Sequence, residues 1–173
     1  MEIADESVTD YGTHDPASVV IEGASAYFYD RFQGVVCRYA QNGVVPIIPK
    51  MSNYFQAVGH LHMTTRGDAI AGFDRQHMMY LLTLTGLEDG DVTLGYDEVK
   101  GGWSSYFSFV PEAYGRVGLE LVTFKETTLE DDTVVSMWLH HKNDLRANFY
   151  GVQGTPAIKW VANQGPSLTK LFK

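Results

Sequence analysis

The chain has 173 residues, of which 45% are apolar and 20% are charged. This length and composition predict one globular domain with its own core, and they exclude a disordered or collagen-like chain. Thirteen basic residues stand against 21 acidic ones, which gives a formal net charge of −8. Because such a surface repels phosphate groups, we expect neither direct nucleic-acid binding nor binding to an anionic membrane.

The first 16 residues are acidic and polar and predict an N-terminal arm, followed by a single β-rich domain over residues 17–173. The arm lacks the basic start and apolar centre of a secretory signal peptide, and no apolar run approaches the roughly 20 residues that span a bilayer. We therefore expect a cytoplasmic protein with no membrane partner. Cys37, the only cysteine, lies in an apolar run and is expected to be a buried core residue.

Short segments rich in Val, Tyr, Phe, Thr and Trp alternate with Gly, Asn and Asp, a pattern typical of antiparallel β proteins. Asn42-Gly43 predicts a tight hairpin turn, and Asp89-Gly90 predicts a second. A third turn is predicted at residues 142–144. The predicted strands are 18–22, 24–32, 34–41, 43–48, 59–65, 68–73, 77–85, 91–97, 102–109, 117–125, 132–141, 144–150 and 156–161.

One short helix is predicted where apolar residues from Met51 to Val58 recur at helical spacing, between Pro49 and Gly59. The run from His77 to Thr85 is apolar on both faces, which predicts a central strand covered on both sides. The predicted fold is mainly β: an antiparallel, calycin-like β-barrel or a β-sandwich, with one short helix. Of the two we favour the barrel, with the helix closing one end.

Aromatic residues make up 13% of the chain. Tyr27, Tyr29 and Arg31 share one face of a predicted strand, where two phenols and a cation could position a ligand and act as catalytic groups. Our main hypothesis is a small β-barrel that encloses an apolar or aromatic small molecule and could act as a cofactor-free cyclase or isomerase. Further candidates for binding the ligand are Tyr39, Trp103, Tyr106 and Trp138.

The first alternative is a structural subunit of a homo-oligomeric ring, tube or virion-like shell. The acidic arm and a C-terminal segment with Leu168, Leu171 and Phe172 could each dock on a neighbouring copy. A terminal helical turn is predicted over residues 166–172. Exposed strand edges favour such assembly unless they are protected. The sequence holds no nucleophilic-serine motif and no phosphate-binding loop, which agrees with a structural role.

The second alternative is a metal-dependent enzyme built on His60 and His62. If residues 59–65 form a strand, both imidazoles point to the same face, as two metal ligands on one strand must. Asp68 could supply a carboxylate. His77, His140 or His141 could supply the third imidazole, and of these we favour His141. The main hypothesis requires no metal.

Overall fold

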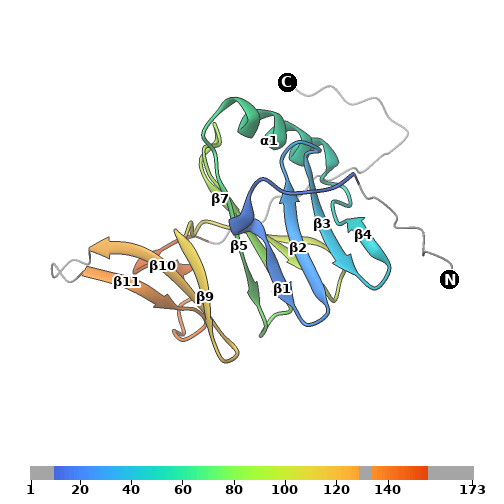
Figure 1. Ribbon diagram of the computed structural model, residues 1–173. Helices are drawn as coiled ribbons and strands as arrows, with labels where there is room; N and C mark the ends of the chain where they lie inside the picture. The colour runs from blue at the N-terminus through green and yellow to red at the C-terminus, as the bar shows by residue number, and fades with distance from the viewer. Residues whose placement is uncertain (1–9, 129–133, 156–173) are drawn as a thin grey trace, which may run out of the picture.

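In the part of the chain that the structure describes, the fold consists of stacked antiparallel sheets and one α-helix (Figure 1). The computed structural model describes residues 10–128 and 134–155. The first sheet has the order β1-β2-β3-β4, with strands Val20–Glu22, Ser25–Asp30, Val35–Ala40 and Gly43–Pro46. The second has the order β5-β6-β7-β8, with strands Ala69–Asp74, Met79–Leu84, Val92–Asp97 and Gly102–Phe107.

A third sheet lies to one side of these two in Figure 1. It has the order β11-β10-β9, with strands Val134–Leu139, Glu120–Thr128 and Ala113–Val117. A short pair, β12 (Asn148–Phe149) and β13 (Val152–Gln153), follows it, and a 3-10 turn, η1 (Pro16–Ser18), precedes β1.

The predicted mainly β fold is confirmed, and its arrangement is that of a β-sandwich. Our preference for a barrel was wrong: among the described strands no sheet closes on itself. A barrel requires its first and last strands to pair, whereas these strands form separate ladders that bury their faces against one another.

The two sides of β6 contribute to two different hydrophobic cores. Tyr80, Leu82 and Leu84 pack with the first sheet and the helix, whereas Leu81 packs with Phe109 and Leu121 beneath the third sheet. Alternate residues of a strand point to opposite faces, so one strand serves both cores. The prediction of a central strand covered on both sides is confirmed.

The helix, α1 (Ser52–Thr64), is longer than predicted and includes most of the segment that we expected to form a strand at 59–65. Its buried residues are Phe55, Val58, Gly59 and His62, which continue the helical spacing through the glycine. Gly59 does not end the helix. A Cβ at this position would lie 2.5 Å from the carbonyl oxygen of Arg31 and 2.9 Å from the Cα of Gly34. The glycine therefore allows α1 to lie against the β2–β3 turn, and the strand prediction was wrong.

Local turn chemistry was predicted with mixed success. β3–β4 and β6–β7 are antiparallel pairs joined at the two predicted turns. At residues 142–144 no hairpin forms, because β11 pairs with β10 and β12 with β13. Strand β9 was not predicted as a separate strand. The predicted strand at 156–161 and helical turn at 166–172 lie outside the described residues.

Two smaller expectations can also be compared with the structure. Cys37 is a buried free thiol in β3, as expected, and burial raises its pKa to about 12. Of the helices in the described part of the chain, none is long and apolar enough to cross a membrane.

Candidate functional site

The predicted catalytic tyrosines lie in the closed core between the first two sheets. Tyr27 stacks on Tyr80 with ring centroids 5.1 Å apart, and Tyr29 is completely buried near His62. Burial raises the pKa of Tyr27 to about 12 and also raises the pKa of Tyr29. Neither residue lines the groove described below or the smaller cavity beside β4. In this arrangement both rings fill core volume.

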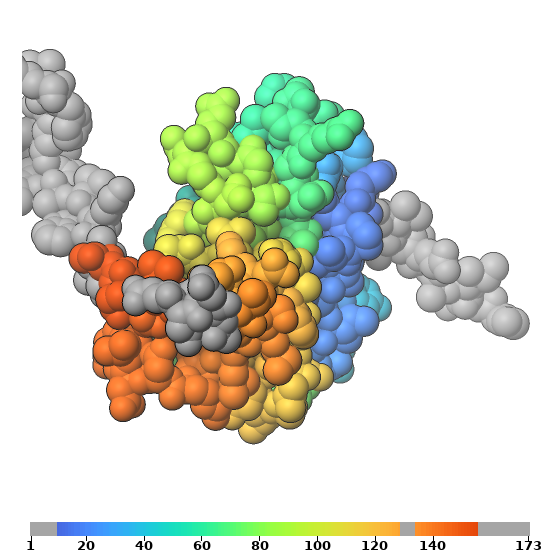
Figure 2. Space-filling view, turned by 90° about the vertical axis from the view of Figure 1, so that its left-hand side faces the viewer, coloured from blue at the N-terminus to red at the C-terminus, as the bar shows by residue number. Residues whose placement is uncertain are grey.

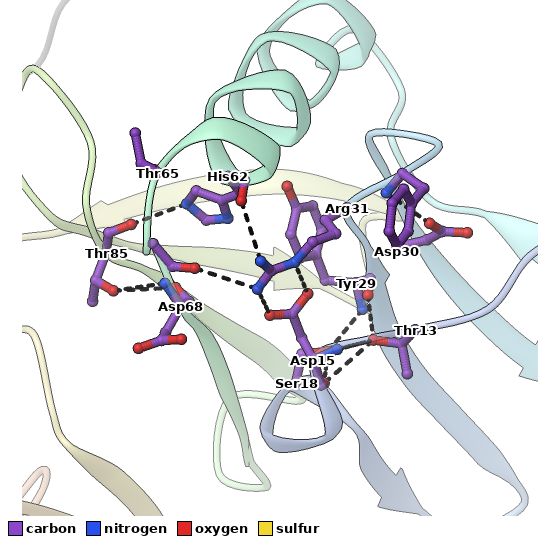
Figure 3. A network of polar contacts seen from close by, with 12 residues as sticks. Thr13, Asp15, Ser18, Tyr29, Asp30, Arg31, His62, Thr65, Asp68 and Thr85 are labelled. Atoms are coloured by element: carbon purple, nitrogen blue, oxygen red, sulfur yellow. Dashed lines mark hydrogen bonds and ion pairs between the residues drawn. The ribbon is translucent and has the colours of Figure 1, made fainter.

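Arg31 belongs to a polar network that joins three parts of the chain (Figure 3). Its guanidinium pairs with both carboxylate oxygens of Asp15 and donates to the carbonyl oxygens of His62 and Gly67. Residues around Thr13 are held in the same network, since the Thr13 hydroxyl donates to the carbonyl oxygen of Tyr29 at 2.6 Å. The described end of the predicted arm is therefore hydrogen-bonded to the end of β2, and Arg31 has a structural role in this contact.

The four predicted ligand-binding residues are not brought together. Tyr39 is exposed on the first sheet, and Trp103 donates a hydrogen bond to the carbonyl oxygen of Ile47 at the edge of the first core. Tyr106 and Trp138 do line one common surface, a groove of about 1950 Å³.

This groove is about three times as large as the cavity of about 620 Å³ beside β4. Figure 2 shows this face of the molecule, with the turn around residues 87–92 and α1 in its upper part and residues 134–155 in its lower part. Its walls combine aromatic rings with acidic residues of the upper turn. The aromatic residues are Tyr54, Tyr106, Phe107, Trp138, Phe149 and Tyr150, and the acidic ones are Glu88, Asp89 and Asp91.

A carboxylate and two imidazoles meet beside the groove, whose lining includes both imidazoles, His77 and His141. The Oδ2 atom of Asp74 lies 2.8 Å from His77 Nδ1 and 2.8 Å from His141 Nε2. Asp74 is the last residue of β5, His77 follows in the β5–β6 turn, and His141 comes two residues after β11. The potential ligand atoms of the three side chains all lie within 4.8 Å of one another.

The carboxylate of this cluster is held in its ionised form. Although burial opposes ionisation, hydrogen bonds from His141 and His77 lower the pKa of Asp74 to about 2. Its second oxygen, Oδ1, accepts the backbone N–H of Gln76 at 3.0 Å. Both oxygens of a nearly buried anion are thus satisfied by hydrogen-bond donors.

His140 has a different environment although it adjoins His141. Its Nε2 atom lies 2.8 Å from the Thr123 hydroxyl, and Tyr150 donates to the same hydroxyl at 3.1 Å. Burial lowers the pKa of His140 to about 4, so its ring is neutral at pH 7. Its role here is that of a buried hydrogen-bonded group beneath the groove wall.

The predicted pair His60 and His62 is separated by the helix. Residues two apart on an α-helix point about 200° apart, so the two imidazoles do not share a face. His62 is buried, with Nε2 2.9 Å from the carbonyl oxygen of Thr85, while His60 is exposed. The structure places His141 with Asp74 and His77 instead of with this pair.

Asp74 is the residue of the cluster that the sequence analysis missed. The only local signal is an Asp-x-x-His spacing directly after a predicted strand. His77 and His141 were considered as possible third imidazoles, but their carboxylate partner was placed at Asp68. The 67 positions between Asp74 and His141 leave no periodic pattern that could link them.

A scan against protein-family models, a search of curated proteins and a search of solved structures each find no match to this chain.

Proposed function

We propose that the protein is a structural subunit that associates with a second copy of itself through the outer face of the β9–β11 sheet and through the edge of β11 that pairs with no other described strand. The observation that carries this proposal is an apolar surface on a sheet whose last strand has no protecting residue. Support comes from the exposure of these side chains, from the strand edge and from the placement of the tyrosines in a closed core.

The outer face of this sheet carries a cluster of exposed apolar side chains. Phe124 on β10 is the cross-strand partner of Met137 on β11, and Leu139 lies two positions from Met137 on the same face. Val122, the cross-strand partner of Leu139, is itself buried. The exposed fractions are 40% for Phe124, 61% for Met137 and 48% for Leu139. Adjacent exposed apolar residues on one sheet face are typical of interaction surfaces rather than of isolated surface residues.

The edge of β11 is also suited to pairing with another strand. Residues 134–139 contain no charge and no proline, and among the described residues only β10 pairs with this strand. The edge strands of the first sheet differ, because β1 ends at an ion-paired Glu22 and β4 ends at Pro46. Charges and prolines are the devices that protect an edge from adding a further strand, and β11 has neither.

The net charge of −8 predicts how such association depends on salt. Two acidic copies repel each other at long range, while the proposed contact itself is apolar. Added salt shortens the screening length from about 10 Å at 0.1 M to about 3 Å at 1 M. Association by this surface should therefore strengthen as salt is added, whereas an interface built on ion pairs should weaken.

The test is the mass of the full chain by sedimentation equilibrium and native mass spectrometry. We expect the wild type to form a dimer or larger assembly at micromolar concentration, and Met137→Lys to remain a single chain. Lysine makes the chain less negative, so it does not increase the repulsion between two copies. A fall from the assembled mass to the single-chain mass would therefore result from the lost apolar contact. Val99→Lys is the matched control, because Val99 is 80% exposed and lies in the β7–β8 turn of the second sheet.

Two results would contradict the proposal. One is a single-chain mass for the wild type across the concentration range at low and high salt. The other is an assembly that survives Met137→Lys but is lost on deletion of residues 166–173, which would place the interface at the C-terminal segment.

The second candidate function is the binding of an apolar or aromatic small molecule, now in the groove rather than in a barrel. The aromatic wall with Tyr106 and Trp138 supports it, because aromatic side chains with few polar groups are typical of ligand sites. We expect the fluorescent probe 1-anilinonaphthalene-8-sulfonate to bind the wild type and to bind Tyr106→Ala more weakly. Tyr39→Ala is the control. If Met137→Lys lowers probe binding and Tyr106→Ala does not, the probe reports the β9–β11 face and this candidate fails.

A further inference from the structure

We propose that Asp74, His77 and His141 form a binding site for a divalent first-row transition-metal ion, with Zn²⁺ as the best-matched ion. The geometry and charge of these three side chains support this site, which is independent of the proposed assembly.

The geometry needs little adjustment to hold an ion. His77 Nδ1 and His141 Nε2 are both directed at Asp74 Oδ2, at 2.8 Å each. In a tetrahedral zinc site with ligand bonds of about 2.1 Å, neighbouring ligand atoms lie about 3.4 Å apart. The two imidazoles would thus have to withdraw from the carboxylate by about 0.6 Å. Both imidazoles are at least a third exposed, which leaves room for this movement.

The charge of the cluster favours a cation. Asp74 is 4% exposed, and in the described part of the chain no lysine or arginine pairs with its carboxyl group. The basic residues that adjoin the cluster in sequence have other partners: Arg75 pairs with Glu22, and Lys142 pairs with Glu120. A bound cation would bring to this carboxylate the positive charge that no described lysine or arginine supplies.

The ligand set indicates which ions fit. Two imidazoles and one carboxylate match zinc and its transition-metal neighbours, whereas calcium and magnesium prefer oxygen ligands alone. Only three protein ligands meet here among the described residues. Because His77 and His141 both line the groove, the remaining coordination position would face it. This arrangement is that of an open metal site and not of a closed structural one.

Metal binding at this position would also link two parts of the fold. Asp74 ends β5 of the second sheet and His77 lies in the turn that follows, while His141 follows β11 of the third sheet. An ion that binds only the folded chain stabilises it by mass action. At a free ion concentration 100 times the Kd, we expect the Tm to rise by about 5 °C.

The experiment is isothermal titration of the full chain, freed of metal by chelator, with ZnCl₂. The expected result is one ion per chain, together with a rise in Tm that EDTA reverses. Titration with Co²⁺ adds a spectroscopic readout, because the intensity of its visible absorption reports the coordination number. The informative variants are His77→Gln and His141→Gln, because the glutamine amide can still donate to Asp74 but is a poor metal ligand.

Each glutamine variant should lose affinity about 100-fold or more, since even the partners of metal ligands contribute about 10- to 100-fold. Each should keep the wild-type circular dichroism spectrum and the wild-type Tm in EDTA. His60→Gln is the matched control, because His60 is exposed and lies outside the cluster. The proposal is overturned if the wild type takes up no stoichiometric ion. It is also overturned if both glutamine variants bind Zn²⁺ as the wild type does.

Discussion

Arg31 and Asp15 form a two-point ion pair in which Nε of the guanidinium lies 2.8 Å from Oδ2 of the carboxylate and Nη2 contacts Oδ1. The same guanidinium donates to the carbonyl oxygens of His62, at 3.2 Å, and Gly67, at 3.3 Å. One side chain therefore joins the segment before β1, the end of β2 and the residues around the end of α1 (Figure 3). Asp15 is nearly buried and has no other cationic partner among the described residues.

Arg31→Ala should lower stability and not simply remove a ligand contact. Removing one member of a buried ion pair leaves the other charge uncompensated, which costs about 3–5 kcal/mol. Because the Arg31 side chain is 19% exposed, we expect a loss near the lower end, about 3 kcal/mol. Urea unfolding at neutral pH measures it, with the exposed Arg66→Ala as control. A change below about 1 kcal/mol, the usual contribution of a surface ion pair, would contradict this structural role.

His140 should make the fold less stable in mild acid. Burial lowers its pKa from 6.5 to about 4, so the unfolded chain binds a proton in this range that the folded chain does not. Stability should be complete above about pH 6.5 and fall as the pH drops toward 4. Between pH 7.5 and pH 5 the expected loss from this group is about 2 kcal/mol.

His62 acts in the same direction, because burial lowers its pKa as well. The measurement that isolates His140 is therefore a comparison of wild type and His140→Gln by urea unfolding at both pH values. Glutamine can keep the contact with Thr123 but does not titrate. The pH-dependent loss should be smaller in the variant by about 2 kcal/mol, and equal losses would show that His140 does not contribute.

Gly59→Ala should destabilise the protein although alanine favours helices. The gain in helix propensity is about 1 kcal/mol. The added Cβ would meet backbone atoms of Arg31 and Gly34 at 2.5 and 2.9 Å, and backbone cannot move aside as a flexible side chain can. We expect a net loss of about 2 kcal/mol in chemical unfolding. Gly12→Ala, where a Cβ would meet no atom within 4 Å, is the control. A more stable Gly59→Ala would mean that α1 does not pack this closely on the β2–β3 turn.

Tyr114→Phe tests the contact between the second and third sheets. The Tyr114 hydroxyl lies 2.7 Å from Thr83 Oγ1, which lies 2.7 Å from Thr93 Oγ1. Because the ring itself is kept, the variant removes only this hydrogen bond, and we expect a loss of about 1 kcal/mol in unfolding free energy. Tyr39→Phe, at an exposed tyrosine, should change stability by a few tenths of a kcal/mol at most. Equal effects of the two variants would argue against a hydrogen-bonded link between the sheets.

Sequence reasoning was most successful where the signal is local. Asn42-Gly43 and Asp89-Gly90 each predicted a hairpin, since these residues tolerate the backbone angles of tight turns and need no distant partner. The central position of β6 followed from apolar residues on both of its faces. The error at residues 59–65 has an equally specific cause. Gly59 resembled a helix terminator, but its missing side chain provides space for Gly34, a contact between two separate elements.

The sequence by itself therefore determined a mainly β, antiparallel fold with one helix, because alternation and turn chemistry act within a few residues. The tertiary structure alone decided which strand faces meet. It placed Tyr27 and Tyr29 in a closed core and left Met137 on an outer face. It also brought His141 next to Asp74, which lies 67 positions earlier in the chain, and to His77. Such contacts depend on how the sheets stack and on which side of each strand is covered. Alternation with a period of two residues assigns each residue to one of the two faces of a strand, but it does not determine what either face contacts.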